Sequence, residues 1–304
     1  MNQRCALFCP AYAGLSDAEF DRAETMAQQL AAACHWQLNW LPSSRSGLAP
    51  GHWLPAAQRL DELRHILDQV DILWALRGGY GCLHLVPELS QLTVRRAPLL
   101  IGFSDLTVLH GLWARRGWGP SIHGPMPAIG GGEQAIGSLR QLLNGDSLHW
   151  DQQSHPEVEV AFPGSAKGPL FPACLRVLAG MVGTAAMPHL AGHILAIEDI
   201  DERPYAIDRA LSQLYQAGCL EGLRGLVTGR FPGADGGHGS DARGPSLHAV
   251  LGEWAQRLAL PCIYALPFGH EADPLSLPCG GLAELSCDGR DWSLRVRLHS
   301  RDPT

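Results

Sequence analysis

Short apolar runs alternate with segments of helical periodicity along the first third of the chain. The run 5–9 is typical of a buried strand, and Ser16 and Glu19 have the spacing of a capping box that begins a helix. Apolar residues then follow at helical spacing and predict the buried side of that helix: Phe20, Ala23, Ala27, Leu30 and Cys34. Further strands are predicted at 36–40, 71–76 and 98–102, with a second helix whose apolar side carries Leu60, Leu63, Leu67 and Val70. Strands separated by helical stretches predict a mostly parallel, doubly wound sheet.

The periodicity weakens between Asn144 and Gly168, where Asn-Gly and Pro-Gly pairs predict turns. We therefore expect an N-terminal α/β domain over 1–145, a linker over 146–167 and a C-terminal β-rich domain over 168–304. The elements predicted beyond the linker are strands at 193–197, 225–228 and 262–266, helices at 207–217 and 246–258, and a hairpin about Asp288 and Gly289. The predicted fold class is α/β, with a doubly wound N-terminal sheet followed by a β-rich α/β domain.

The composition is that of a compact globular protein. Of 304 residues, 46% are hydrophobic and 17% are charged, which argues against disorder. The net charge of −7, without a basic stripe, argues against a nucleic-acid partner. The apolar run at the N-terminus is shorter than the roughly 7 to 15 residues of a signal peptide. We therefore expect a cytoplasmic protein with no membrane partner.

The nine cysteines are odd in number and scattered, and no two have the spacing of a zinc or redox motif. They are predicted to be reduced thiols, mostly in the core. His270 and Glu271 are adjacent, but no second histidine follows four residues later, as a zinc-protease motif requires. We expect neither a metal nor a cofactor.

Polar residues follow four of the predicted strands, at the edge where open α/β sheets bind ligands. The segments are Arg77–Gly81, Gly102–Asp105, Glu198–Asp199 and Gly269–Glu271. Together they supply a glycine-rich loop, a hydroxyl, a carboxylate and an imidazole. These are the parts of a nucleophilic hydrolase.

Ser104 is the candidate nucleophile, because it lies on a tight turn between Gly102 and a helix-like run at 106–116. The alternative interpretation is a helix N-cap, a frequent role of serine after a strand. The nucleophile elbow of the α/β-hydrolases is incomplete here, since Leu106 stands where its second glycine would be.

Glu198 ends an apolar strand and is a candidate to orient a histidine. The alternative is an acid that complements a helix N-terminus. Asp199, Asp201 and Glu202 crowd the same turn, and spacing does not choose among them. His270, taken singly, fits a structural role as well as a catalytic one.

The loop Arg77–Gly81 lacks the ending of a P-loop and the spacing of a dinucleotide fingerprint. Its backbone amides are candidates for an oxyanion hole, and a plain tight turn is the alternative. Arg77, Gly78 and Tyr80 are candidate substrate-binding residues. Arg77 is chosen because a guanidinium suits a carboxylate, with a solvated arginine as the alternative.

Five motifs stand in order along the chain: A-L-R-G-G-Y-G at 75–81, I-G-F-S-D-L-T at 101–107, H-G-P-M at 123–126, I-E-D at 197–199 with P-Y-A-I-D-R at 204–209, and L-P-F-G-H-E at 266–271. They resemble motifs of the LD-carboxypeptidases, the muramoyltetrapeptide carboxypeptidases of bacterial peptidoglycan recycling. The similarity extends from the first strand to about Leu277.

The resemblance implies a serine peptidase in which Ser104 is the nucleophile, His270 is the general base and acid, and Glu198 orients the histidine. It also implies an oxyanion hole formed by the backbone amides of Gly79 and Asp105. The implied substrate is a murein tetrapeptide, free or attached to muramic acid as a muropeptide, from which the terminal D-Ala is released. Members of the family are commonly homodimers, so a homodimer is expected.

The chain departs from the family pattern at two places. F-P-A-C at 171–174 stands where a pair of glycines is usual, and C-P-A-Y-A-G at 9–14 stands where an Ala-Pro-Ser-Gly loop is usual. Both are candidates for loops that border the substrate cleft, so they bear on specificity more than on the type of reaction.

Two other functions fit the sequence. A related serine hydrolase would give immunity to microcin-like peptidyl adenylates, and an aromatic platform for adenine, with Trp113 and Trp118 as candidates, would favour it. A peptide-binding protein without turnover would use the same cleft and keep the triad as structure.

Overall fold

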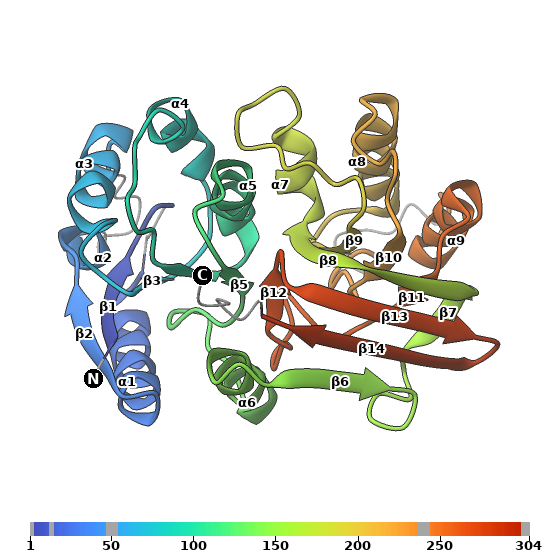
Figure 1. The fold of residues 1–304 in the computed structure, drawn as a ribbon, viewed down its shortest axis with the longest axis horizontal. Coiled ribbons are helices and arrows are strands. Elements are labelled where there is room, and N and C mark those ends of the chain that lie inside the picture. The colour runs from blue at the N-terminus through green and yellow to red at the C-terminus, as the bar shows by residue number, and fades with distance from the viewer. Residues whose placement is uncertain (1–2, 12–14, 47–53, 236–243, 299–304) are drawn as a thin grey trace.

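The computed structural model describes residues 3–11, 15–46, 54–235 and 244–298, which form two β-sheets flanked by helices (Figure 1). The first sheet contains β1 (Gln3–Phe8), β2 (Trp36–Trp40), β3 (Ile72–Ala75), β4 (Leu99–Gly102), β5 (Ser121–His123) and β12 (Leu277–Cys279). Its strand order is β12-β5-β4-β3-β1-β2, and all neighbours are parallel except β12 and β5. The predicted doubly wound sheet is confirmed.

The second sheet contains β6 (Ser147–Asp151), β7 (Glu159–Phe162), β8 (Gly164–Cys174), β9 (Ile194–Glu198), β10 (Gly225–Thr228), β11 (Cys262–Tyr264), β13 (Leu282–Asp288) and β14 (Asp291–Arg297). Its order is β6-β14-β13-β8-β9-β10-β11-β7. Strands β8 to β11 are parallel, whereas the outer strands pair antiparallel. The centre of this sheet therefore presents carboxyl strand ends at one edge, as the first sheet does.

The stretch 146–167, predicted as a linker, is not a free connection. It contains β6, which pairs with β14, and β7, which pairs with β11. The two strands are short and their partners lie more than 100 residues later, so local periodicity did not indicate them. Strand β12, from the predicted C-terminal domain, completes the first sheet instead of the second.

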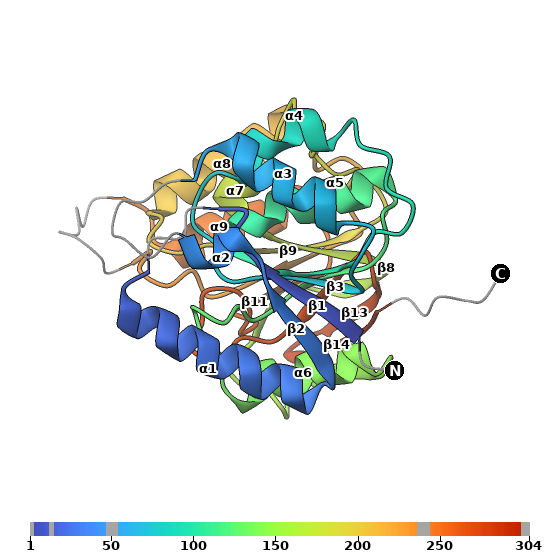
Figure 2. The same ribbon diagram turned by 90° about the vertical axis from the view of Figure 1, so that its left-hand side faces the viewer.

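Helices cover both faces of the sheets. They are α1 (Asp17–Ala33), α2 (Pro42–Ser46), α3 (Ala56–Ile66), α4 (Val86–Leu89), α5 (Thr107–Arg116), α6 (Glu133–Leu143), α7 (Leu175–Gly180), α8 (Pro204–Gln216) and α9 (Leu247–Leu258), with 3-10 turns η1 (Cys82–Leu85) and η2 (Ser104–Leu106). Figure 2 shows α1 and α6 on one side and α3, α4, α5, α7 and α8 on the other. Helix α1 begins where predicted, because Ser16 and Glu19 form the capping box. None of the described helices has the length and hydropathy that a membrane span needs.

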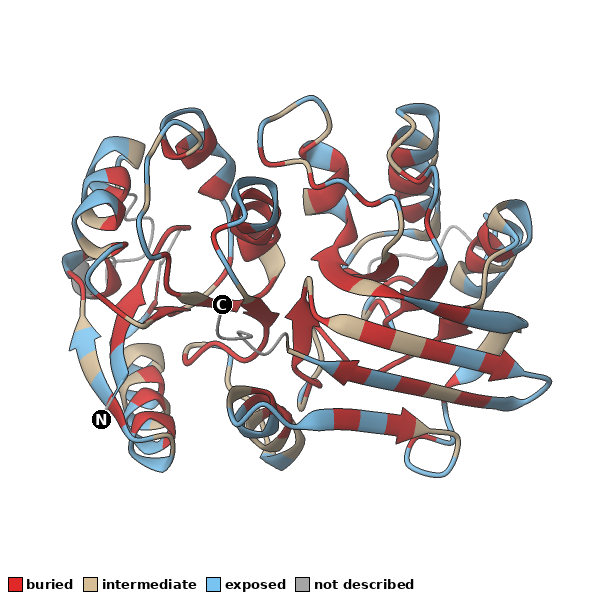
Figure 3. Cartoon of the chain, in the orientation of Figure 1, coloured by how far each residue is buried: buried red, intermediate tan, exposed pale blue. Residues whose placement is uncertain are grey.

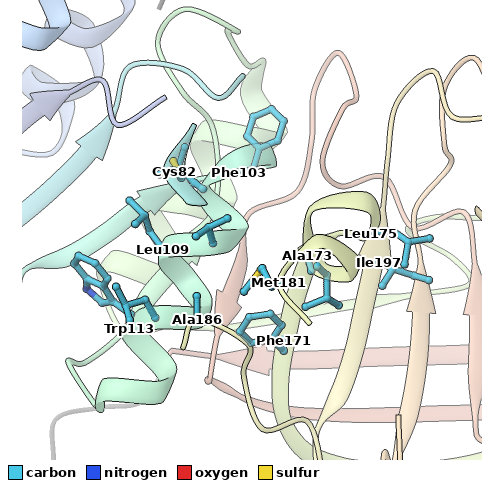
Figure 4. Packing of buried hydrophobic residues seen from close by; sticks show 14 of the residues in the cluster. Cys82, Phe103, Leu109, Trp113, Phe171, Ala173, Leu175, Met181, Ala186 and Ile197 are labelled. Atoms are coloured by element: carbon cyan, nitrogen blue, oxygen red, sulfur yellow. The ribbon is translucent and has the colours of Figure 1, made fainter. Parts of the chain in front are cut away.

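A continuous core joins the two halves of the chain. Burial follows the strands of both sheets and the inner sides of the helices (Figure 3). In Figure 4, Leu109 and Trp113 of α5 share a cluster with Phe171 of β8 and with Met181. The sheet that carries Ser104 and the sheet that carries Glu198 are thus held together by shared apolar packing.

Two further predictions, the C-terminal hairpin and the reduced cysteines, agree with the structure. The C-terminal hairpin of β13 and β14 is confirmed, and its alternating Trp292, Leu294 and Val296 are buried. All nine cysteines are free thiols, and all but Cys34 and Cys219 are buried, as expected of reduced core residues.

Candidate active site

Ser104 has a backbone conformation that is unusual for serine. Its φ is +64°, in the left-handed region, which costs a non-glycine residue about 1 to 2 kcal/mol. It follows β4 and begins η2, which leads into α5. The caps of these two helices are Phe103 and Leu106, and neither helix receives a side-chain capping hydrogen bond. The N-cap interpretation of Ser104 is therefore wrong, and strain of this kind is typical of a functional turn.

The glycine-rich loop lies against Ser104. A Cβ on Gly78 would be 2.8 Å from the Cβ of Ser104 and 3.1 Å from its Oγ, so glycine is required for this approach. The Asp105 carboxylate accepts a hydrogen bond from the Cys82 amide at 2.8 Å, which ties the end of the loop to the turn of Ser104. Gly79 follows Gly78 directly and is exposed, and its part in an oxyanion hole stays a prediction.

His110 supports the strand that leads to the turn. Its ring is fully buried in α5, and its Nε2 donates a hydrogen bond to the Gly102 carbonyl at 2.8 Å. Burial lowers the pKa of His110 to about 3, so the ring is neutral and its proton is on Nε2. The backbone two residues before Ser104 is thereby fixed from within the core.

Glu198 and His270 form a buried pair at the carboxyl edge of the second sheet. Glu198 ends β9 and is 1% exposed. Its Oε2 accepts hydrogen bonds from His270 Nδ1 at 2.7 Å and from the His270 amide at 3.1 Å. A Cβ on Gly269 would lie 2.2 Å from the Glu198 Cδ, so only glycine allows this loop to approach the carboxylate. Because the carboxylate serves His270, the interpretation of Glu198 as a helix-complementing acid is wrong.

The pair is polarised by its surroundings. Burial raises the pKa of Glu198, but its interactions with His123 and His270 outweigh burial and hold that pKa at about 2. Burial lowers the pKa of His270, yet the Glu198 hydrogen bond and the charges of Glu198, Asp199 and Asp201 outweigh burial and raise it. An ionised carboxylate therefore strengthens the imidazole as a base.

Asp199 has the helix-supporting role that was considered for Glu198. Its Oδ2 accepts a hydrogen bond from the Arg176 amide at 2.7 Å, in the first turn of α7, and its Oδ1 accepts one from the Ile200 amide at 2.9 Å. Burial raises the pKa of Asp199 to about 6. Glu202 forms an ion pair with the Arg176 guanidinium at 3.2 Å. Among the crowded acids, Glu198 is the one that the fold directs to His270.

The turn of Ser104 and the buried pair meet at Phe103, the residue before Ser104. The Phe103 ring packs edge-on against the His270 ring, with centroids 5.1 Å apart. Within the described residues no hydrogen bond joins Ser104 to His270, and catalytic hydrogen bonds often tighten only in the complex with substrate. Because Glu198 holds Nδ1, the nitrogen of His270 that remains for a reacting group is Nε2.

The predicted substrate-binding residues stay predictions. Tyr80 is 60% exposed, and Arg77 is half-buried with its charge acting on Glu19 of α1. Part of the departure at 9–14 cannot be placed, since residues 12–14 lie outside the described part of the chain.

The departure at 171–174 is not a cleft loop, contrary to expectation. These residues end β8 and are buried. Cys174 is in register with Glu198, and its amide donates a hydrogen bond to Thr107 Oγ1 at 3.0 Å. The bulkier sequence therefore packs behind the buried pair and joins it to α5.

Two sequence profiles of one family match the chain. That of the LD-carboxypeptidase N-terminal domain matches residues 6–124, and that of the LD-carboxypeptidase C-terminal domain matches residues 167–285. The chain belongs to the LD-carboxypeptidase family. The resemblance seen in the five motifs is confirmed, and with it an enzyme of the carboxypeptidase class.

Individual LD-carboxypeptidases support the assignment. The chain is 34% identical over 259 residues to the murein tetrapeptide carboxypeptidase of Pseudomonas aeruginosa, covering 77% of this chain and 79% of the relative. It is 27% identical over 241 residues to the probable murein peptide carboxypeptidase of Bacillus subtilis, covering 75% and 73%.

Solved structures agree on the fold. The muramoyltetrapeptide carboxypeptidase from Oxalobacter formigenes superimposes with a TM-score of 0.79 at 26% identity, covering 97% of this chain and 100% of that one. An MccF-like protein from Bacillus anthracis gives a TM-score of 0.79 at 17% identity, covering 98% and 97%, which shows a shared fold alone.

Neither His110 nor Phe103 is among the residues predicted from the sequence of this LD-carboxypeptidase. The sequence carries a signal for His110, because this residue stands in the apolar run 108–113 and a histidine buried there needs a polar partner. Phe103 had no such signal, since its contact with His270 depends on a residue 167 positions later.

Proposed function

We propose that this LD-carboxypeptidase is a serine peptidase that releases the terminal D-Ala from murein tetrapeptides, free or attached to muramic acid. The observation that carries the proposal is the buried Glu198–His270 pair beside the strained turn of Ser104. The 34% identity to a murein tetrapeptide carboxypeptidase supports the substrate class. The bond cleaved joins the L-centre of diaminopimelate, or Lys, to D-Ala.

The proposed reaction is a two-step acyl transfer to Ser104 and then to water. Ser104 Oγ attacks the carbonyl carbon of the scissile amide while its proton passes to His270 Nε2. The amides of Gly79 and Asp105 stabilise the oxyanion. The C–N bond then breaks, and the proton on Nε2 goes to the departing D-Ala amine. Water, deprotonated by the same nitrogen, hydrolyses the acyl-enzyme and frees Ser104.

The charges suit these proton transfers. Glu198 stays ionised and is hydrogen-bonded to Nδ1, so the imidazolium that forms in each step is stabilised where it arises. Arg77 is the proposed partner of the D-Ala carboxylate, with Gly78 and Tyr80 nearby in the chain. We further propose that the enzyme is a cytoplasmic homodimer that acts in peptidoglycan recycling, as the family resemblance implies.

The structural likeness to MccF-like proteins raises the alternative of a hydrolase for peptidyl adenylates. Its candidate adenine platform does not suit that role. Trp113 is fully buried and donates a hydrogen bond to the Pro98 carbonyl at 3.1 Å, and Trp118 packs edge-on against it with centroids 4.9 Å apart. Neither ring is available to stack on a base, which favours the carboxypeptidase.

Incubation of the purified protein with murein tetrapeptide, followed by mass spectrometry of D-Ala, tests the proposal. Tripeptide and D-Ala from the wild type but not from Ser104→Ala would establish both reaction and nucleophile. Equal cleavage by both proteins would remove Ser104 from the mechanism. Cleavage by neither would direct the search to peptidyl adenylates. A serine-directed fluorophosphonate that labels neither protein would favour a peptide-binding protein.

A further inference from the structure

One carboxylate oxygen of Glu198 accepts no hydrogen bond from His270. Both hydrogen bonds from His270 end at Oε2. Oε1 is buried and accepts no hydrogen bond from any described residue. An unpaired carboxylate oxygen in the interior is costly, so a donor is needed on this side of the carboxylate.

His123 presents a nitrogen to that oxygen. Its Nε2 lies 3.6 Å from Glu198 Oε1, and both side chains are 1% exposed. This Nε2 also lacks a hydrogen-bond partner within the described residues. The distance exceeds that of a good hydrogen bond by only a few tenths of an ångström, so a small movement of either side chain brings the two unsatisfied atoms together.

The ring of His123 is held by aromatic neighbours. Its centroid lies 5.5 Å from that of Phe103 and 5.7 Å from that of Phe268. Phe103 packs in turn against His270. Packing on this scale fixes the orientation of the imidazole before any substrate binds.

His123 belongs to the sheet of the nucleophile. It is the last residue of β5 and is in register with Gly102 of β4, two residues before Ser104. Glu198 belongs to the second sheet. The His123–Glu198 contact therefore links the sheet that carries Ser104 to the pair that is to act on it.

We propose that His123 is a positioning residue whose Nε2–H donates to Glu198 Oε1 and turns Oε2 toward His270 Nδ1. In this role it aligns the imidazole with Ser104 across the junction of the two sheets. His123 is too buried to contact substrate, so it acts through Glu198 alone. The inference rests on the serine mechanism proposed above, but not on the murein substrate.

Two variants of His123 distinguish the effect of its N–H donor from the effect of its aromatic packing. His123→Phe keeps the aromatic packing and removes the N–H, whereas His123→Gln keeps an N–H at similar reach. The first readout is the rate at which a fluorophosphonate labels Ser104, and the second is kcat and KM for murein tetrapeptide. We expect His123→Phe to lower the labelling rate and kcat about tenfold with KM nearly unchanged, and His123→Gln to recover most of the loss.

The same change in a Glu198→Gln background decides whether His123 acts through Glu198. Once the carboxylate is an amide, a residue that positions the carboxylate has little left to do, so His123→Phe should lower the labelling rate by less than about twofold there. An equal loss in both backgrounds would mean a general structural role and would overturn the inference. If His123→Phe does not fold, His123→Met against His123→Gln gives the same comparison of absent and present donor.

The outcomes distinguish this inference from the proposed function. A wild type that is labelled at Ser104 in a His123-dependent way but releases no D-Ala contradicts the substrate and supports the positioning role. A folded His123→Phe protein that is labelled as fast as wild type overturns the positioning role alone. A wild type that is neither labelled nor active overturns both.

Discussion

The two sheets prepare their proposed catalytic groups by different means. In the first sheet the preparation lies in the backbone, since Ser104 has a φ of +64° and the Gly78 loop lies against its side chain. In the second sheet it lies in burial and charge, since Glu198 is ionised in the interior and holds His270 by a 2.7 Å hydrogen bond. The proposed nucleophile is positioned by shape, and the proposed acid–base pair by charge in addition to the close approach of Gly269.

The difference has a consequence for mutagenesis. A backbone device is sensitive to an added methyl group, whatever its charge, because the space is already filled. An electrostatic device is sensitive to the loss of a charge, even when the shape is kept. Substitutions of each kind, made on each side, should therefore have unequal effects.

The largest effect is expected from Ser104→Ala, which removes the proposed nucleophile and leaves the pair intact. We expect kcat for D-Ala release to fall about a million-fold, as in other triad enzymes. The far-ultraviolet circular dichroism should match that of the wild type. Turnover within tenfold of wild type would exclude a covalent role for Ser104.

Glu198→Gln keeps the shape of the buried side chain and removes its charge. We expect kcat to fall about ten-thousand-fold, because the tautomer and the imidazolium of His270 lose their partner. Asp199→Asn is the matched control. It also removes a buried charge that acts on His270, but its carboxylate accepts hydrogen bonds from the Arg176 and Ile200 amides and not from His270. Comparable losses in the two variants would contradict a specific role for Glu198.

Gly78→Ala adds one methyl group on the side of the nucleophile. Its Cβ would lie 2.8 Å from the Ser104 Cβ, so the loop must move. If the loop supplies the proposed oxyanion hole, we expect kcat to fall about a hundredfold. Gly137→Ala in α6, where a Cβ meets nothing within 4 Å, should leave kcat unchanged. Wild-type activity in Gly78→Ala would contradict the proposal that this loop contributes to the oxyanion hole.

The pH dependence of kcat/KM tests the electrostatic role of the Glu198–His270 pair. His270 must be neutral to accept the Ser104 proton, and its pKa is raised above the ordinary 6.5, so kcat/KM should rise with pH through a value above 6.5. In Glu198→Gln the largest of the interactions that raise the pKa of His270 is gone, so the rising limb of the profile should move to lower pH. If the rising limb of the kcat/KM profile stays at the same pH in Glu198→Gln, a group other than His270 controls that limb.

The smallest effect concerns the backbone strain at Ser104. Ser104→Gly and Ser104→Ala both lack the hydroxyl, but glycine adopts a φ of +64° without cost. The glycine variant should therefore be about 1 kcal/mol more stable than the alanine variant in denaturant unfolding. A glycine variant that is less stable than the alanine one would show that the turn is not strained.

Local patterns determined a large part of this protein. The capping box of Ser16 and Glu19 began α1 at the predicted residue, and the alternation around Asp288 and Gly289 predicted the final hairpin. The glycine loop, Ser104, Glu198 and His270 were recognised as candidates because each follows a strand. Such features repeat with the period of a helix or strand, or stand at its end, and so are visible within about ten residues of sequence.

Only the tertiary structure decided how these parts meet. Strands β6, β7 and β12 are short, and the strands they pair with are distant in the chain, so their own residues carry little periodicity. The choice of Glu198 over its acidic neighbours depends on a hydrogen bond to a residue 72 positions later. The His123–Glu198 contact joins two sheets. Periodicity records which side of an element is buried, whereas contacts of this kind depend on which buried sides the whole chain brings together.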